Sequence, residues 1–179
     1  MNLPNKLTVF RMCMVPLFVI FMYLPIPGKY LISLIIFAVA AITDAMDGNI
    51  ARKYNLVTDF GKFMDPLADK LLVISALICM IEARLVPGWI VIIIVARELA
   101  VSIMRAIAAA DGKVIAAGNS GKLKTIVQMV AIVLLLFGAH LDSSGIITAG
   151  KVLIYIAAAL TIYSGYEYFA NNKYLFEDR

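Results

Sequence analysis

The stretch that decides the fold is residues 86–108, which reads VPGWIVIIIVARELAVSIMRAIA. It is mostly apolar over the length that a helix needs to cross the hydrocarbon core of a bilayer, about 20 residues. Five further stretches of this kind lie at 7–25, 31–50, 66–82, 124–140 and 147–170. A chain of 179 residues has room for these spans and little else. We therefore predict an all-α, polytopic integral membrane protein with about six transmembrane helices, in a single domain over residues 1–179.

The composition and the turn residues agree with this prediction. Hydrophobic residues make up 63% of the chain and the mean hydropathy is +0.92, whereas roughly half of a soluble domain is apolar. Proline, glycine and aspartate at 25–28, 87–88 and 142–145 predict short turns after the first, third and fifth spans. The opening segment 2–8 predicts a short interfacial helix that leads into the first span.

The distribution of basic residues predicts the orientation of the spans. Twelve Lys and Arg residues fall on the side that holds the N-terminus, three fall on the other side, and Arg97 lies within a span. Cytoplasmic loops carry the excess of Lys and Arg in membrane proteins. Both termini and the two polar connections, at about 51–65 and 109–123, are therefore expected on the cytoplasmic side.

Four aspartates predict a metal site at that side. Asp44 and Asp47 are three positions apart near the end of the second span, and Asp65 and Asp69 are four apart at the start of the third. Each pair shares one face of a helix, and the short connection favours an antiparallel helix pair. Four converging carboxylates cannot all stay ionised without cations. Oxygen ligands of this kind suit Mg²⁺ or Mn²⁺, and four of them suggest two ions.

Small residues and an arginine accompany the aspartates. Gly48, Ala51 and Gly61 let helices or a substrate approach the backbone closely, and Arg52 is suited to bidentate phosphate binding. The alternative is a set of helix-end carboxylates solvated by interfacial water. That alternative does not account for the glycines and the arginine beside them.

The full pattern over these 26 residues is specific. It reads Asp44-x2-Asp47-Gly48-x2-Ala51-Arg52-x8-Gly61-x3-Asp65-x3-Asp69. At every defined position it resembles the signature of the CDP-alcohol phosphatidyltransferases, and the resemblance in length and number of spans covers the whole chain. Members of that family displace CMP from a CDP-linked lipid by an alcohol acceptor.

The resemblance implies roles for the residues of the pattern. Three aspartates resemble metal ligands, namely Asp44, Asp47 and Asp65. Asp69 resembles the general base that takes the proton of the acceptor hydroxyl, and it is also expected to touch a metal. The residues that resemble the cytidine-diphosphate pocket are Gly48, Ala51, Arg52 and Gly61. The implied cofactors are two Mg²⁺ or Mn²⁺ ions.

Other parts of the chain resemble the family members that use sn-glycerol 3-phosphate as acceptor. These parts are residues 3–8 with Arg11, residues 96–98 with Ser102 and Arg105, and residues 121–125. The expected donor is CDP-diacylglycerol and the expected product is phosphatidylglycerophosphate. Inositol phosphate, serine or phosphatidylglycerol remain alternative acceptors. A divalent-cation transporter is a further alternative, although transporter sites usually lie near the membrane midplane.

A phosphorylated acceptor needs a cationic pocket. Arg105, Lys122 and Lys124 are candidates near cytoplasmic helix ends, where snorkelling to the lipid headgroups is the alternative explanation. Arg97 lies deeper in its span, and a buried cation that faces the aspartates or the acceptor phosphate would explain it. Its neighbour Glu98 is not expected to pair with it, because adjacent positions on a helix point apart.

The first segment carries three candidates for closing the site, namely Asn5, Thr8 and Arg11. We expect a multi-pass protein of a bacterial-type cytoplasmic membrane, with the active site on the cytoplasmic side. The expected partners are CDP-diacylglycerol, sn-glycerol 3-phosphate and membrane lipids, with no nucleic acid, and the resemblance implies a homodimer.

Overall fold

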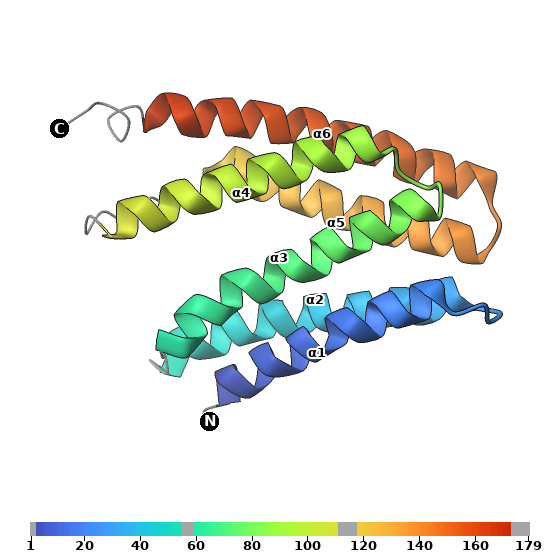
Figure 1. The fold of residues 1–179 in the computed structure, drawn as a ribbon, viewed down its shortest axis with the longest axis horizontal. Helices are drawn as coiled ribbons and strands as arrows, with labels where there is room; N and C mark the ends of the chain where they lie inside the picture. Colours follow the sequence, from blue (N-terminus) through green and yellow to red (C-terminus); the bar gives the residue numbers. More distant parts are fainter. Residues whose placement is uncertain (1–2, 55–58, 111–117, 173–179) are drawn as a thin grey trace.

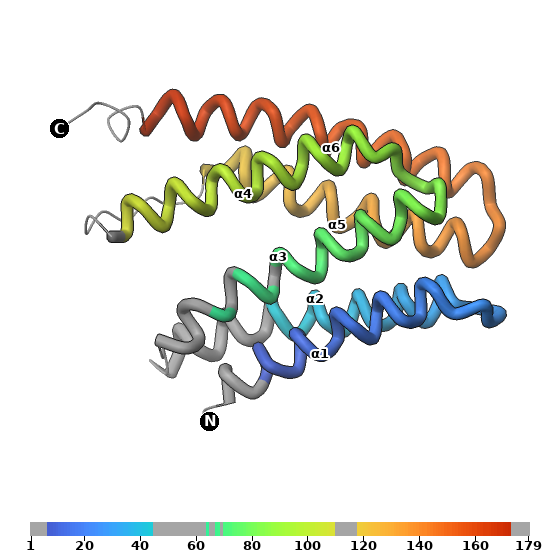
Figure 2. The backbone as a smooth tube through the Cα atoms, in the orientation of Figure 1, coloured from blue at the N-terminus to red at the C-terminus, as the bar shows by residue number. Residues whose placement is uncertain are grey.

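A computed structural model describes the backbone of residues 3–54, 59–110 and 118–172 (Figure 1). Side chains are described for residues 7–44, 64, 67–68, 70–109 and 118–172, and the other residues are grey in Figure 2. Within these ranges the chain forms helices and no strands. The helices are α1 (Leu3–Tyr23), α2 (Lys29–Tyr54), α3 (Asp59–Glu82), α4 (Gly88–Ala110), α5 (Asn119–His140) and α6 (Ser144–Asn171). The prediction of an all-α fold is confirmed.

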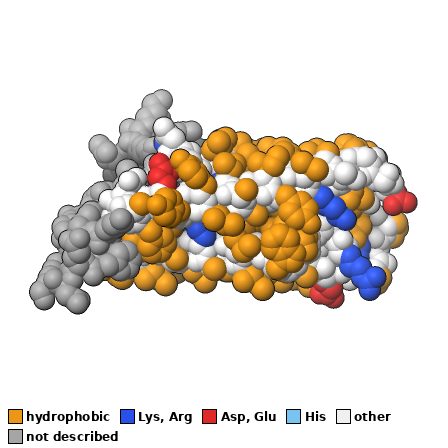
Figure 3. Space-filling model, turned by 90° about the horizontal axis from the view of Figure 1, so that it is seen from above, with side chains coloured by type: hydrophobic (Ala, Val, Ile, Leu, Met, Phe, Trp, Pro, Cys, Tyr) orange, Lys and Arg blue, Asp and Glu red, His pale blue; other side chains and the backbone are white. Residues whose placement is uncertain are grey.

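The lengths and surfaces of the helices suit a membrane. The shortest helix, α1, has 21 residues and at 1.5 Å per residue it matches the hydrocarbon thickness of about 30 Å. By length and composition, α5 and α6 could each cross a membrane, and 7–23 is a shorter apolar segment. Figure 3 shows a flank of the molecule that is largely hydrophobic between its described ends. These features support a membrane protein, whereas six crossings remain a prediction.

The helices alternate in direction along the chain (Figure 1). The start of α1 and the end of α6 therefore lie at one end of the molecule, together with the ends of α2 and α4. The three short turns lie at the opposite end, where the sequence predicted them. Gly28, Arg84 and Asp142 have positive φ values of 78°, 56° and 50°, a conformation that glycine and, among other residues, aspartate adopt most readily.

Two predicted boundaries are wrong. Residues 3–8 form the first turns of α1, so there is no separate interfacial helix in the described residues. The connection predicted at about 51–65 is too long, because α2 continues to Tyr54 and α3 begins at Asp59, both beyond their apolar stretches. A helix satisfies its own backbone hydrogen bonds, so it need not end where the apolar sequence ends. The aspartate pattern consequently lies on helices.

The core joins side chains of all six helices. Its fully buried members include Phe18, Phe37, Leu77, Ile94, Leu135 and Ile154. Helices α1, α2 and α3 contact one another on one side of the molecule, and α6 contacts both α4 and α5 on the other. The two groups meet where α2 contacts α5 and where α3 contacts α4 and α5.

The hairpin of α5 and α6 depends on close packing at Gly150. A Cβ atom built on Gly150 would lie 2.8 Å from Cγ of Leu135 and 3.1 Å from its backbone nitrogen. The side chain of Leu135 is itself fully buried. A methyl group at Gly150 would therefore push the two helices apart.

We predict that Gly150→Ala lowers the stability of the protein by about 1–3 kcal/mol, the usual range for overpacking a well-packed site. The measurement is thermal unfolding of the purified protein in detergent. Gly145→Ala is the matched control, because Gly145 is also in α6 and a Cβ there would meet nothing within 4 Å. An unchanged melting temperature in Gly150→Ala would contradict this account of the hairpin.

Candidate active site

The predicted metal ligands lie on two helices at the end of the molecule that holds the start of α1. Asp44 and Asp47 are on α2, and Asp65 and Asp69 are on α3. The side chains of Asp47, Asp65 and Asp69 lie outside the described residues. Among the described side chains there is no group of three His, Cys, Asp or Glu that could hold a metal. A centre of four aspartates therefore stays a prediction.

The predicted nucleotide pocket and part of the predicted closure also fall outside the described side chains. Gly48, Ala51 and Arg52 are on α2 and Gly61 is on α3. Asn5 is in the first turns of α1. The helices thus carry the whole pattern at one end of the molecule, and the orientation of these residues stays a prediction.

The first helix reaches the acidic end through Arg11. Its Nη1 atom lies 2.5 Å from Oδ1 of Asp44, which is 42% exposed. Arg11 and Thr8, one turn apart on α1, are both about 1% exposed. The contact joins a predicted closure residue to a predicted metal ligand. The charge of the Asp44 carboxylate is therefore partly compensated by a buried cation from another helix.

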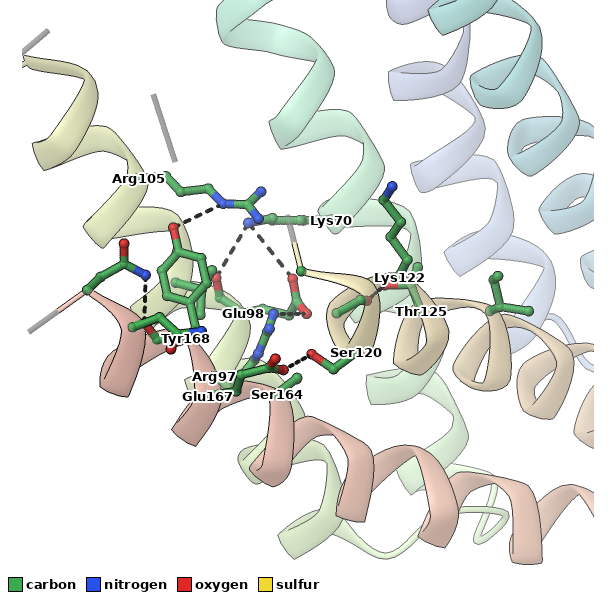
Figure 4. A pocket seen from close by; sticks show the side chains of 16 residues that line it. Lys70, Arg97, Glu98, Arg105, Ser120, Lys122, Thr125, Ser164, Glu167 and Tyr168 are labelled. Carbon is green, nitrogen blue, oxygen red and sulfur yellow. Dashed lines mark hydrogen bonds and ion pairs between the residues drawn. The ribbon is translucent and has the colours of Figure 1, made fainter. Parts of the chain in front are cut away.

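A cavity of about 930 Å³ opens between α4, α5 and α6 (Figure 4). Three of the four predicted acceptor cations line it, namely Arg97, Arg105 and Lys122. Lys70 of α3, which follows Asp69 in the sequence, lines it as well. The structure therefore brings together cations that are far apart in the sequence.

Arg97 does contact Glu98, contrary to the prediction. Nη1 of Arg97 lies 3.5 Å from Oε1 of Glu98, and the two side chains are 14% and 17% exposed. The rule that adjacent positions point apart applies to Cβ atoms, and a guanidinium at the end of a long side chain can fold back. The Nε atom of Arg97 is buried and has no hydrogen-bond partner. An unsatisfied buried donor is costly, so a ligand oxygen in the cavity would stabilise it.

Two lysines from neighbouring helices also contact Glu98. Lys124 of α5 donates a hydrogen bond to Oε1 of Glu98. Nζ of Lys70 lies 3.9 Å from Oε2 of Glu98 and donates to its backbone carbonyl at 3.4 Å. Neither Glu98 nor Lys70 was among the predicted site residues. An acid within an apolar stretch was the signal that could have found Glu98.

Lys124, the fourth predicted acceptor cation, lies behind this cluster. It is 3% exposed and lines a smaller cavity of about 40 Å³, which shares Lys70 and Glu98 with the larger one. Gln128, one turn further along α5, lines the same small cavity, and its buried Oε1 has no hydrogen-bond partner. Lys124 is thus linked to the larger cavity through its contact with Glu98, which lines both cavities.

Two further pairs support the walls of the larger cavity. Nε of Arg105 donates to the Tyr168 hydroxyl at 3.3 Å, and its guanidinium lies 5.5 Å from the centre of that ring. This arrangement combines a hydrogen bond with a cation–π contact. Elsewhere in the lining, the Ser120 hydroxyl donates to Oε2 of Glu167. Arg105 is thereby held at the cavity, although its side chain is largely exposed.

The charge and size of the cavity suit a small phosphorylated ligand. Four basic side chains and two acidic ones line it, namely Lys70, Arg97, Arg105, Lys122, Glu98 and Glu167. Guanidinium groups bind phosphate oxygens in a bidentate manner, and small-molecule sites occupy about 300–1,000 Å³. The excess positive charge therefore favours an anion such as a phosphate monoester.

The position of Arg97 depends on a glycine of α6. A Cβ atom at Gly165 would lie 3.2 Å from Cγ of Arg97. That distance is shorter than ordinary van der Waals contact, so any side chain at Gly165 would shift the arginine. The small residue allows Arg97 to lie between α4 and α6 and to reach the cavity.

Comparisons with known proteins show which proteins the chain resembles. The chain matches the family described as CDP-alcohol phosphatidyltransferase over residues 1–163. It is 42% identical to the CDP-diacylglycerol–glycerol-3-phosphate 3-phosphatidyltransferase of Bacillus subtilis (strain 168), with 96% of this chain and 95% of that protein covered. Proteins of the same name from Rickettsia bellii (strain RML369-C) and Salmonella typhimurium (strain LT2) are 41% and 39% identical. The first alignment covers 97% of each chain, and the second covers 93% of this chain and 92% of the relative.

We predict that Gly165→Ala weakens anion binding in the cavity, because the added methyl group displaces Arg97. The dissociation constant for inorganic phosphate should rise at least about threefold, which corresponds to roughly 0.7 kcal/mol. The measurement is the phosphate-dependent rise in melting temperature. Gly145→Ala at the far end of α6 should bind phosphate as the unaltered protein does, and equal affinities in both variants would contradict the prediction.

Proposed function

The chain belongs to the CDP-alcohol phosphatidyltransferase family, and we propose that it transfers a phosphatidyl group from CDP-diacylglycerol to sn-glycerol 3-phosphate. The products are phosphatidylglycerophosphate and CMP. Relatives named for this reaction align with nearly the whole chain. The observation that carries the choice of acceptor is the cavity lined by Arg97, Arg105 and Lys122. A phosphorylated acceptor would use these cations, whereas free serine would bring no phosphate to them.

The reaction is a displacement at phosphorus. The acceptor hydroxyl oxygen forms a bond to the phosphorus of the phosphatidyl group, and the bond from that phosphorus to the CMP oxygen breaks. Asp69 takes the proton of the hydroxyl as a general base. The carboxylates of Asp44, Asp47, Asp65 and Asp69 would hold two Mg²⁺ or Mn²⁺ ions, for which oxygen donors are suitable. Bound there, such ions would supply positive charge to neutralise the pyrophosphate and the departing CMP.

The donor half of the site is carried by the first three helices. Gly48, Ala51, Arg52 and Gly61 form the pocket for the cytidine diphosphate. Asn5, Thr8 and Arg11 close it from α1, which is supported by the contact between Arg11 and Asp44. Because Arg11 is buried beside a metal ligand, it also limits the negative charge that gathers there.

The acceptor half is carried by the last three helices. Arg97, Arg105 and Lys122 bind the acceptor phosphate, and Lys124 reinforces their charge from the adjoining cavity. The buried Nε of Arg97 is a ready donor for a phosphate oxygen. Tyr168 keeps the Arg105 guanidinium at the cavity, which reduces the entropy lost when the phosphate binds.

The setting is a cytoplasmic membrane of bacterial type. Residues 1–179 form one domain that crosses the bilayer six times, with both termini and the active site on the cytoplasmic side. The count of twelve basic residues against three supports this orientation. CDP-diacylglycerol reaches the site from the surrounding lipid. The protein acts as a homodimer.

The first prediction from the proposed function is that the purified protein releases CMP from CDP-diacylglycerol only when sn-glycerol 3-phosphate and a divalent cation are both present. The experiment compares sn-glycerol 3-phosphate with serine, inositol phosphate and phosphatidylglycerol, and identifies the lipid product of each reaction. Faster release with another acceptor would move the protein to a different reaction within the family. Metal flux in proteoliposomes without any CMP release would favour a transporter.

The second prediction concerns the base. Asp69→Asn should lower kcat by at least about 10²-fold, the lower end of the contribution of general-base catalysis, while the melting temperature changes little. Asp142→Asn is the matched control, because Asp142 lies in the opposite turn with φ of 50° and asparagine also tolerates that conformation. Turnover at the unaltered rate in Asp69→Asn would exclude the assigned role.

A further inference from the structure

Glu98 is a partly buried acid for which the proposed reaction provides no task. Its carboxylate is 17% exposed and lies in α4, on the wall between the two cavities. It accepts a hydrogen bond from Lys124 of α5, lies 3.5 Å from Nη1 of Arg97 and lies 3.9 Å from Nζ of Lys70. Cations from three helices therefore converge on one carboxylate, and Figure 4 shows two of them, Lys70 and Arg97, beside Glu98.

The convergence requires Glu98. Lysine and arginine side chains at the edge of an apolar bundle repel one another, and their long stems would let each charge move out to water. A partly buried carboxylate among them holds the cations in place instead, because ion pairs are stronger where water is excluded. Lys124 is 3% exposed, and removal of one member of a buried ion pair is strongly destabilising. Glu98 therefore helps to fix where Arg97 and Lys124 lie.

Glu98 also connects the two halves of the site. Lys70 directly follows Asp69 on α3. Its ammonium group approaches the Glu98 carboxylate and also donates to the Glu98 backbone carbonyl at 3.4 Å. The α3 turn that bears the proposed base is thereby joined to the α4 turn that bears Arg97.

We propose that Glu98 is a positioning residue that sets the separation between the acceptor-phosphate cations and the α3 turn of Asp69. The inference rests on the proposed function. This separation selects acceptors by the length of chain between the phosphate and the attacking hydroxyl. In sn-glycerol 3-phosphate the two groups are joined by three carbons. Phosphate monoesters with a shorter or longer chain would place the hydroxyl away from the base.

The test uses three acceptors that differ only in chain length, namely 2-hydroxyethyl, 3-hydroxypropyl and 4-hydroxybutyl phosphate. The unaltered protein should prefer the three-carbon compound in kcat/KM. In Glu98→Asp the carboxylate retracts toward α4 by one methylene, and the cations that follow it move away from α3. The preference for three carbons over four should then fall by about tenfold.

A role in stability alone has a different signature. If Glu98 only stabilised the fold, Glu98→Asp would change kcat/KM for all three acceptors by one common factor. An unchanged ratio would therefore overturn the inference while CMP release by the unaltered protein still supported the proposed function. Absence of CMP release from the unaltered protein with every acceptor would instead refute the function itself.

Glu98→Gln provides a second measurement, because it keeps the size of the side chain and removes the charge. The KM for sn-glycerol 3-phosphate should rise at least about tenfold, and the KM for CDP-diacylglycerol should change less than about twofold. Equal changes in both constants would overturn the inference. Glu82→Gln is the matched control, since Glu82 accepts a hydrogen bond from Tyr23 at the opposite end of α3; it should leave both constants unchanged.

If Glu98→Gln does not fold, the double variant Glu98→Gln/Lys124→Met replaces the buried pair by uncharged side chains, which bundles often tolerate. Its melting temperature should recover toward that of the unaltered protein. The preference for three carbons over four should stay reduced, because Lys70 and Arg97 still lack the carboxylate. Recovery of the original preference in the double variant would show that the pair serves stability only.

Discussion

The Glu98 carboxylate lies among cations from α3, α4 and α5, inside a bundle whose flank is largely apolar. Charged groups in such a setting are stable only when they are paired and hydrogen-bonded. The same requirement applies at the other group of helices, where buried Arg11 meets Asp44. The pairs of Glu98 with Lys70 and Lys124 and the pair of Arg11 with Asp44 tie helices together. The arrangement of the bundle and the chemistry of its polar end therefore depend on the same ion pairs.

Much of the fold could be predicted from the sequence, because a long apolar run indicates a helix that is in contact with lipid or with other helices. Proline and glycine marked the three short turns, and Gly28 has the positive φ expected of a turn glycine. The polar ends of α2 and α3 could not be predicted in this way. An apolar run records how far a helix is shielded from water, whereas the helix itself ends where its backbone hydrogen bonding stops.

The candidate site could also be predicted only in part. Residues on one helix have a fixed spacing, so the aspartate pattern was visible in the sequence. Arg97 was a candidate because of its depth, and Arg105 and Lys122 were candidates because of their charge near cytoplasmic helix ends. Contacts across helices were not visible. Lys70, Glu98 and Tyr168 reach the cavity because α3, α4 and α6 pack as they do, and no spacing along the chain encodes that. The prediction that Arg97 and Glu98 would not pair was wrong. The charged end of a long side chain need not follow the direction of its Cβ atom.

The grouping of the helices has a consequence for residues outside the site. The aspartates belong to α2 and α3, and most of the cationic cavity belongs to α4, α5 and α6. The two groups meet where α2 contacts α5 and where α3 contacts α4 and α5. Side chains at these contacts set the spacing between the aspartate helices and the cavity, because a close-packed interior transmits changes of volume. A substitution at these contacts would therefore shift the two parts of the site relative to each other without touching either.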